Sequence, residues 1–308
     1  MEFNSIQDFR TNFTHVYHKS VAPKLESFEQ EKNKARLTTK IIWILAVAAT
    51  VFFLFLFNFQ ITQDNLFFVI VPFFLCLGIC RWIGKSFEKK LKLAVMPIVM
   101  RAFGDFAWVP GGTIPYLTLQ QTRLFDRFED QKEDDCFYGT YKGLQINIDE
   151  TELSYTTRDS EGRRHKHIVF SGVLAQIDFK KPFKGHTIIR TRGLFNSKAY
   201  EEVKLEDPEF SKMYFVDAND QIEARYILTT SFMERFKNIK NSFSASQMEA
   251  SIQDSKILIA IHTTKDLFKL GDLNRPVNDT KQFTELLNEF VSILAIVDEL
   301  KLNQNIGL

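Results

Sequence analysis

The stretch from residue 41 to residue 84 constrains this chain most, because it contains two apolar runs that are almost free of charge. The first, Ile41 to Phe59, carries no charge, and a helix needs about 20 apolar residues to cross a hydrocarbon layer. The second, Leu66 to Cys80, is shorter, but apolar residues extend it beyond Arg81, whose side chain can reach the headgroups. A polar turn at 60–65 joins the runs. These features predict a transmembrane helical hairpin; the alternative is a hydrophobic hairpin buried in a soluble protein.

Positive charge flanks the predicted hairpin at both ends, whereas the turn between the runs carries only Asp64. Basic flanks stay on the cytoplasmic side of a membrane. We therefore expect both termini to be cytoplasmic. The flanking cations are Lys32, Lys34, Arg36 and Lys40 before the first run, and Arg81, Lys85, Lys89, Lys90 and Lys92 after the second.

The predicted organisation has four parts. They are an N-terminal amphipathic helical segment (1–40), the transmembrane hairpin (41–84), a helical connector (85–110) and a cytoplasmic α+β domain (111–308). Helical periodicity begins at Ile6, and we expect the first helix to end near Pro23. Pro97 predicts a kink in the connector, and the segment from Trp108 to Gly112 predicts its end.

Composition excludes several classes of protein. Lysine plus arginine (39) nearly balances aspartate plus glutamate (38), which disfavours nucleic-acid binding. Three cysteines make no disulfide framework, and this number fits a reducing compartment. The first eight residues are polar and acidic, unlike the basic and apolar start of a secretory signal.

The chain after Cys136 alternates polar and apolar residues with a period of two, which indicates strands. Short connections favour an antiparallel meander. We expect a bulge around Gly172. The expected strands are 137–141, 144–148, 153–158, 164–179 and 186–192, followed by 213–216 and a second hairpin of 248–252 and 256–262.

Helical signals return after the meander. Asp207 is placed to cap a helix that begins with proline, and a capping box at Ser231 to Glu234 predicts a helix to about Asn241. Residues 221–228 are ambiguous and favour helix. A long amphipathic helix follows a capping box at Asp279 and Gln282. The fold class is therefore α+β: a two-helix transmembrane hairpin, then a cytoplasmic domain with an antiparallel β meander and amphipathic helices.

Two histidine pairs are the candidate metal ligands, His15 with His18 and His165 with His167. Each pair shares a face of its helix or strand. Zinc needs three or four protein ligands, and neither pair has further ligands at suitable spacing. We expect no metal and no cofactor.

Two charged segments are the candidate binding residues. One is a basic run at the start of a strand, which suits anionic headgroups or an acidic partner, or is simply a solvated edge. The other is an acidic segment whose carboxylates suit either binding or helix capping. The residues are Arg163, Arg164, His165 and His167 in the first, and Glu206, Asp207, Glu223 and Arg225 in the second.

Six further motifs lie at Phe137–Gly143, His167–Gly172, Phe183–Thr187, Val203–Phe210, Asp220–Thr229 and Phe232–Arg235. They resemble motifs of a bacterial membrane-protein family of unknown function, domain-of-unknown-function family 3137, some members of which are labelled "galanin". The paired hydrophobic segments match the layout of that family. The resemblance implies no activity, catalytic residue or cofactor, and it implies LemA-type membrane proteins as a candidate partner.

These observations favour a non-enzymatic binding or scaffold protein of a bacterial inner membrane, whose cytoplasmic domain binds a protein partner or lipid headgroups. One alternative is a membrane-bound hydrolase or transferase that uses the acidic segment 206–225 with His262. A pocket that gathers Asp207, Glu223, Arg225 and His262 would support it. A second alternative is an accessory subunit of a transporter or channel, although the uncharged first run offers no ion path by itself.

Overall fold

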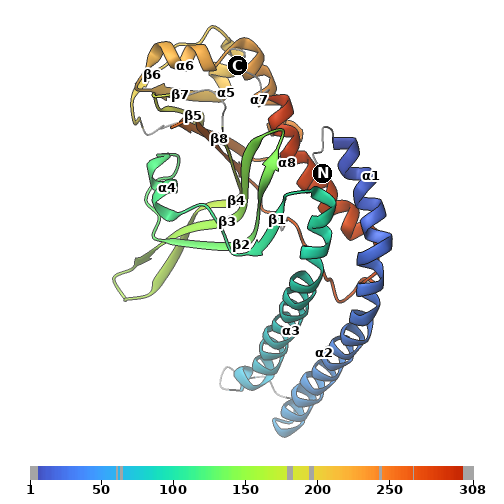
Figure 1. The fold of residues 1–308 in the computed structure, drawn as a ribbon. Coiled ribbons are helices and arrows are strands. Elements are labelled where there is room, and N and C mark those ends of the chain that lie inside the picture. The colour runs from blue at the N-terminus through green and yellow to red at the C-terminus, as the bar shows by residue number, and fades with distance from the viewer. Residues whose placement is uncertain are drawn as a thin grey trace. The chain divides into compact units, whose positions relative to one another are not determined.

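The computed structural model describes residues 6–59, 62, 65–178, 183–193, 198–242, 245–265 and 267–300. Two compact units divide the chain (Figure 1). The sheet unit comprises Met1–Asn12, Met100–Phe268 and Leu287–Leu308. The helical unit comprises Phe13–Val99 and Lys269–Leu286. The four chain segments predicted above stay a prediction.

Two long helices dominate the helical unit, α2 (Ala22–Leu56) and α3 (Leu66–Met100). They lie side by side in Figure 1, and ring contacts join them at Trp43 with Phe73 (5.4 Å between centroids) and at Phe53 with Phe68 (5.6 Å). Both are long and apolar enough to cross a membrane, judged by length and composition. The predicted helix pair is therefore confirmed as a pair of apolar helices.

The predicted helix end near Pro23 was wrong. α1 (Ile6–Val16) continues through a π-helical turn at Tyr17–Val21 directly into α2. Pro23 falls in the first turn of α2, where the missing N–H and the fixed φ of proline cost little. The π-helical turn precedes it, and the Ala22 N–H bonds to the Tyr17 carbonyl.

The ends of the apolar helices also differ from expectation. α2 ends at Leu56 rather than Phe59, and most of the predicted polar turn lies outside the described residues. α3 contains Pro97 and continues to Met100, where a 3-10 turn and Gly104, at a φ of 70°, end it. The helix break predicted at residues 108–112 was therefore placed too late, because these residues begin with a strand.

The sheet unit contains a nine-stranded, wholly antiparallel sheet in the order β1-β2-β3-β4-β9-β8-β5-β7-β6. The two edge strands are short, which limits edge-to-edge pairing. The strands are β1 (Ala107–Pro110), β2 (Asp130–Tyr141), β3 (Leu144–Arg158), β4 (Arg164–Asp178), β5 (Thr187–Thr191), β6 (Glu201–Glu202), β7 (Tyr214–Ala218), β8 (Gln247–Gln253) and β9 (Lys256–His262).

The predicted meander is confirmed for β2 to β4 and wrong beyond them, and β1, which pairs with β2, was not predicted as a strand. β5 does not pair with β4, because the hairpin of β8 and β9 lies between them. Both faces of β9 are apolar and buried from Ile257 to Ile261, as a central strand requires. β3 is one strand rather than two, because its polar middle is paired: Asp149 accepts hydrogen bonds from the backbone N–H groups of Thr113 and Ile114. The predicted end of β4 at Phe179 lies outside the described residues.

The bulge in the β3–β4 hairpin lies at Val169 rather than at Gly172. Leu153 pairs with Phe170 and Ser154 with Ile168, so that Val169 has no partner across the ladder. Gly172 has another role. Its φ is 151°, and an added Cβ would lie 2.0 Å from the carbonyl oxygen of Ile261 on β9.

Five helices follow β1 in the described part of the chain, and a side chain caps the N-terminus of four of them. Asp207 caps α5 as predicted, accepting from the N–H groups of Glu209 and Phe210. Thr229 caps α7, rather than the predicted Ser231, by accepting from Phe232 N–H. Asp279 caps α8 as predicted, but the Gln282 side chain instead bonds to Val277 and Gly271. The helices are α4 (Tyr116–Gln121), α5 (Pro208–Met213), α6 (Gln221–Ile227), α7 (Thr230–Ser242) and α8 (Thr280–Glu299), with Asp220 capping α6.

Apolar side chains pack on both faces of the sheet. On one face, Phe137 of β2 contacts Phe290 of α8 (5.4 Å) and Phe268 (4.6 Å). On the other, a cluster joins the segment around α4 to the central strands. Its members are Ile114, Leu119, Leu124, Phe128, Leu153, Phe170, Leu174, Ile188, Leu258 and Ala260. The sheet is thus enclosed between two apolar layers where its strands are longest.

We expect Gly172→Ala to lower the free energy of unfolding by roughly 2–4 kcal/mol, because the added methyl meets the β9 backbone at an unfavourable φ. Gly162→Ala is the matched control: its φ is 78°, and nothing lies within 4 Å of an added Cβ. It should cost only the backbone contribution, about 1 kcal/mol. Urea unfolding of the detergent-solubilised chain, followed by near-UV circular dichroism, compares the two. Equal losses would contradict the close approach of β9.

Candidate functional site

The outer part of the β3–β4 hairpin, residues 155–167, consists of two strands that pair only with each other. We call this segment the ribbon. β2 pairs with β3 only as far as Ser154, and β9 pairs with β4 only as far as Gly172. Beyond these points the two strands pair only with each other, and Figure 1 shows them extending past the rest of the sheet. Residues 160–168 are all exposed. The ribbon therefore presents both of its faces to solvent.

Cations gather on one face of the ribbon. Directly opposite residues share a face, so Arg158 with Arg164 and Thr156 with Lys166 lie together. Lys166 donates to the Glu152 carboxylate at 2.6 Å. Among the described residues, neither Arg158 nor Arg164 has a carboxylate partner. Two arginines opposite each other repel, so an external anion at this face would relieve that repulsion.

Asp159 organises the end of the ribbon. Its carboxylate accepts from the backbone N–H groups of Glu161 and Arg163, and it contacts the Arg163 Nε at 2.8 Å and the His165 Nε2 at 3.0 Å. Hydrogen bonds from His165 and Arg163 lower the pKa of Asp159 to about 2. Two predicted binding residues, Arg163 and His165, are thus brought together, but they hold the turn.

His167 lies on the face opposite the free arginines. Its ring stacks on Tyr155, with 4.8 Å between centroids, and its Nε2 lies 2.8 Å from the Thr157 hydroxyl. His165 and His167 are therefore engaged with different partners. Among the described residues, no group of three or more His, Cys, Asp or Glu side chains is arranged to hold a metal ion. Within the basic run, Arg164 is the predicted residue that remains available for binding.

We expect the Asp159 carboxyl to titrate near pH 2 rather than near its ordinary value of 3.8. Because this pKa is lowered in the folded chain, the contribution of Asp159 to the order of the turn is complete above about pH 4. It is lost as pH falls through about 2. Carboxyl-carbon NMR of the detergent-solubilised chain measures the titration. The double variant Arg163→Gln/His165→Gln should move the midpoint upward, and an unchanged midpoint would contradict the assigned partners.

The acidic segment is dispersed rather than gathered. Asp207 caps α5 and contacts Lys237 of α7 at 3.5 Å. Glu223 accepts from the backbone N–H groups of Lys184 and Gly185, at 3.1 and 2.5 Å, and so holds the turn before β5.

Glu206, Arg225 and His262 do not share the contacts of Asp207 and Glu223. Glu206 and Arg225 are exposed. His262 lies on β9, with its Nε2 3.7 Å from the Glu249 carboxylate and its ring against Phe170. Because each of these side chains has different neighbours, their contacts describe capping and packing rather than one catalytic pocket.

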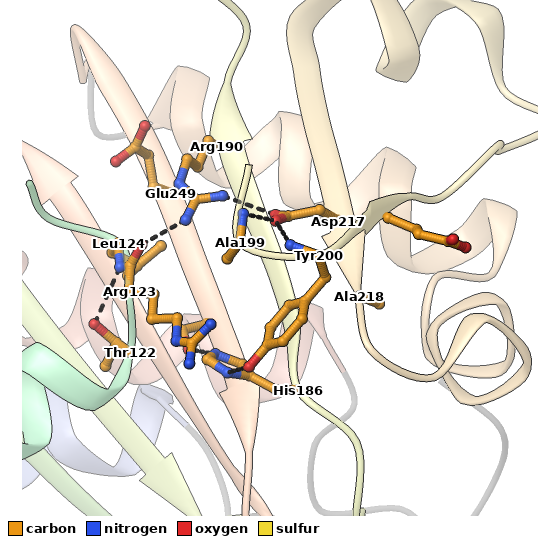
Figure 2. Close-up of polar contacts among 12 residues, drawn as sticks. Thr122, Arg123, Leu124, His186, Arg190, Ala199, Tyr200, Asp217, Ala218 and Glu249 are labelled. Atoms are coloured by element: carbon orange, nitrogen blue, oxygen red, sulfur yellow. Dashed lines mark hydrogen bonds and ion pairs between the residues drawn. The ribbon is translucent and has the colours of Figure 1, made fainter. Parts of the chain in front are cut away.

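A buried polar centre is what sequence reasoning missed (Figure 2). Arg190 of β5 and Asp217 of β7 form an ion pair at 2.7 Å, and Asp217 is completely buried. The second Asp217 oxygen accepts from the N–H groups of Ala199 and Tyr200, at 2.6 and 2.8 Å. Arg190 also donates to the carbonyl of Arg123. The ion pair thus fastens two separate loops to the sheet.

His186 extends this centre. Its Nδ1 lies 3.1 Å from the Tyr200 hydroxyl and its Nε2 lies 2.9 Å from the Ser251 hydroxyl. Burial lowers the pKa of His186, which keeps the ring neutral at neutral pH. The guanidinium of Arg123 lies over the Tyr200 ring, 5.0 Å from its centroid. Both ring nitrogens are engaged, so His186 joins the loop that carries Tyr200 to Ser251 of β8. The sequence signal that could have revealed this centre was one charged residue, Arg190 or Asp217, in each of two segments that are otherwise mainly apolar.

We expect Asp217→Ala to cost about 3–5 kcal/mol of unfolding free energy, because it leaves the Arg190 charge and two loop N–H groups buried without partners. The double variant Arg190→Met/Asp217→Leu removes both charges and should recover part of that loss. Urea unfolding of the full chain compares the variants. A double variant less stable than Asp217→Ala would contradict the penalty of an unpaired charge.

Two of the hollows in the described part of the chain lie along the sheet, and neither contains a predicted site residue. One, of about 110 Å³, has lysines and carboxylates on β2 and β3 in its wall. The other, of about 390 Å³, is more open and is lined largely by the segment before α4. Their linings are Lys132, Glu133, Asp134, Glu150, Thr151, Glu152, Ser171, Gly172, Thr263 and Lys265 for the first, and Gly112 to Tyr116, Gln131 and Glu133 for the second.

Comparison with known proteins bears on the part of the chain from β4 to α8. Residues 168–302 match the family model described as "Protein of unknown function (DUF3137)". The resemblance predicted from the sequence motifs is therefore confirmed over this range, which includes the capped start of α5 and the whole of α6. No curated protein matches the chain.

Among solved structures, the crystal structure of the mycobacterial trehalose monomycolate transport factor A, TtfA, is similar to this chain. The identity is 11%, the match covers 64% of this chain and 90% of that one, and the TM-score is 0.33.

Proposed function

We propose that this chain is a membrane-anchored, non-enzymatic binding protein whose sheet unit presents the ribbon to an anionic partner. The single observation that carries the binding role is the pair of opposed arginines, Arg158 and Arg164, on an exposed two-stranded ribbon.

The anchor is supported by apolar side chains that nothing in the described chain covers. In the most apolar 18-residue windows of the two long helices, 0% and 6% of residues are buried. A core helix of a soluble protein buries most of its apolar surface, because exposing it to water costs about 25 cal/mol per Å². Ile44, Phe67 and Trp82 are each about 70% exposed. A bilayer is the solvent that suits such a surface.

The orientation belongs to the proposal as well. Cations lie at the ends of the helices distant from the turn that joins them, and such ends stay in the cytoplasm. The sheet unit and both termini are then cytoplasmic, in a bacterial inner membrane. The LemA-type partner stays a prediction.

The ribbon suits binding better than a structural role for three reasons. None of the ribbon residues 155–167 belongs to the apolar cluster. Its turn is held by its own carboxylate, Asp159, so that the geometry exists before any partner arrives. The guanidinium groups of its two arginines present forked N–H donors, and this geometry favours binding of carboxylate or phosphate oxygens.

The alternatives have less support. The hydrolase or transferase would need one pocket with Asp207, Glu223 and His262, and their contacts are with different groups. The transporter or channel subunit would need polar groups along the spans, and the described part of the first span, from Ile41 to Leu56, has no charged residue.

The test uses the full chain in nanodiscs of neutral phosphatidylcholine, so that the anchor is satisfied and the ribbon is free. Binding of fluorescent poly-L-glutamate is measured by anisotropy, and flotation with phosphatidylglycerol vesicles forms the second arm. Arg158→Glu/Arg164→Glu should lower affinity on the order of tenfold, and added salt should reduce the effect. Lys204→Glu/Lys212→Glu is the matched control, because both lysines are exposed on the same unit away from the ribbon.

The two arms separate the partner classes. Loss of poly-L-glutamate binding alone assigns an acidic protein segment, and loss of vesicle flotation alone assigns lipid headgroups. Equal losses in the ribbon variant and the control would contradict a role for the ribbon, as would unchanged binding in both.

A further inference from the structure

Exposed cations form a belt where the two apolar helices emerge from their apolar stretches. On α2 the belt consists of Arg36 and Lys40, and on α3 of Arg81 and Lys85; all four are exposed. The two cations of each pair are four positions apart, which is a rise of about 6 Å along the helix. Among the described residues, none of the four has a carboxylate partner.

Contacts between the helices place the two pairs at one level. On one side of the belt the rings of Trp43 and Phe73 are 5.4 Å apart, and on the other side Glu31 and Lys90 are 4.0 Å apart. Both cation pairs lie between these contacts along their helices. The four charges therefore occupy a common band around the helix pair.

Two tryptophans mark the same band. Trp43 follows Lys40 within one turn of α2, and Trp82 follows Arg81 directly on α3, where it is 70% exposed. Tryptophan prefers the headgroup level of a membrane, where one side of its ring is apolar and the indole N–H is wet. Leu37, between the two cations of α2, is already exposed, and exposed apolar side chains continue beyond the belt at Ile41 and Ile44. The belt thus lies at the boundary where phosphate groups would be found.

We infer that this belt is a binding site for the headgroup phosphates of anionic phospholipids, with Arg36, Lys40, Arg81 and Lys85 as its ligands. The inference rests on the proposed membrane anchor and adds lipid selectivity to it. The arginines supply forked donors to phosphate oxygens and the lysines supply mobile point charges. Four cations without carboxylate partners favour a lipid with net negative charge over a zwitterionic one, whose own ammonium group would be repelled.

The full chain is reconstituted in vesicles of brominated phosphatidylcholine with increasing unbrominated phosphatidylglycerol, and the recovery of tryptophan fluorescence reports which lipid contacts the helices. Trp43 and Trp82 lie beside the belt and report directly, whereas Trp108 is buried and adds a constant background. We expect phosphatidylglycerol to be preferred about tenfold at low salt, given a fewfold gain per cation near the surface.

The variant Arg36→Gln/Lys40→Gln/Arg81→Gln/Lys85→Gln should lower that preference to within twofold of unity. Lys132→Gln/Lys184→Gln/Lys204→Gln/Lys212→Gln removes the same charge from exposed positions in the sheet unit and should keep it. Arg36→Lys/Arg81→Lys retains the positive charge without the forked donors of the guanidinium, and it should lose only part of the preference for phosphatidylglycerol. Equal preferences in the two fourfold variants would overturn the site.

Two further arms separate the causes of failure. Millimolar inorganic phosphate that abolished the preference would show a site for free phosphate and overturn the assignment to lipid. Extraction of the chain from membranes by alkaline carbonate would overturn the anchor itself. A retained chain without lipid preference would overturn only the belt.

Discussion

The pairing of β4 with β9 is the interaction on which the sheet unit depends. Seven residue pairs, from Gly172 with His262 to Asp178 with Lys256, join the meander of β1 to β4 to the remaining five strands. Gly172 permits this join, because its missing Cβ leaves room for the β9 backbone. β9 then pairs with β8, and β8 supports β5. The buried ion pair and the ribbon both depend on this framework, one on each side of the junction.

Charged residues divide into two physical classes in this fold. Arg190 and Asp217 are buried, and their charges are satisfied by each other and by loop backbone. A desolvated pair of this kind holds its neighbours in one arrangement and leaves no capacity for a ligand. Arg158 and Arg164 are exposed and opposed, with water as their present solvent. The difference in burial, rather than in residue type, is what separates scaffold from candidate binding surface.

Local signals in the sequence predicted much of the fold. The cap at Asp207 before Pro208, the β8–β9 hairpin and the long period of α8 each depend on neighbouring residues and were correct. The position of β9 beside β4 was missed because strand partners distant in sequence leave no periodic trace. Thr229 was missed because a second hydroxyl, two residues on, offered an equally plausible cap.

The candidate site was predictable to a lesser extent. The basic run around Arg164 was recognised, because consecutive cations at a strand start are visible in the sequence. That Asp159 holds Arg163 and His165 while Arg164 remains available follows from the turn and the register. Arg190 and Asp217 escaped notice because charged residues in strands are usually solvated, and only the loops that cover them make them buried.

The sheet unit is discontinuous along the chain, and this order has a consequence for biosynthesis. Its residues come from three segments, separated by the apolar helices and by residues 269–286. Synthesis of β9 (Lys256–His262) is completed about 160 residues after the end of α3 at Met100, which corresponds to roughly 8–32 seconds of synthesis. During that interval β4 has an unpaired edge. The apolar helices are therefore synthesised first, and the sheet is completed only near the end of translation. A chaperone that covers unpaired strand edges would act on the chain during this interval.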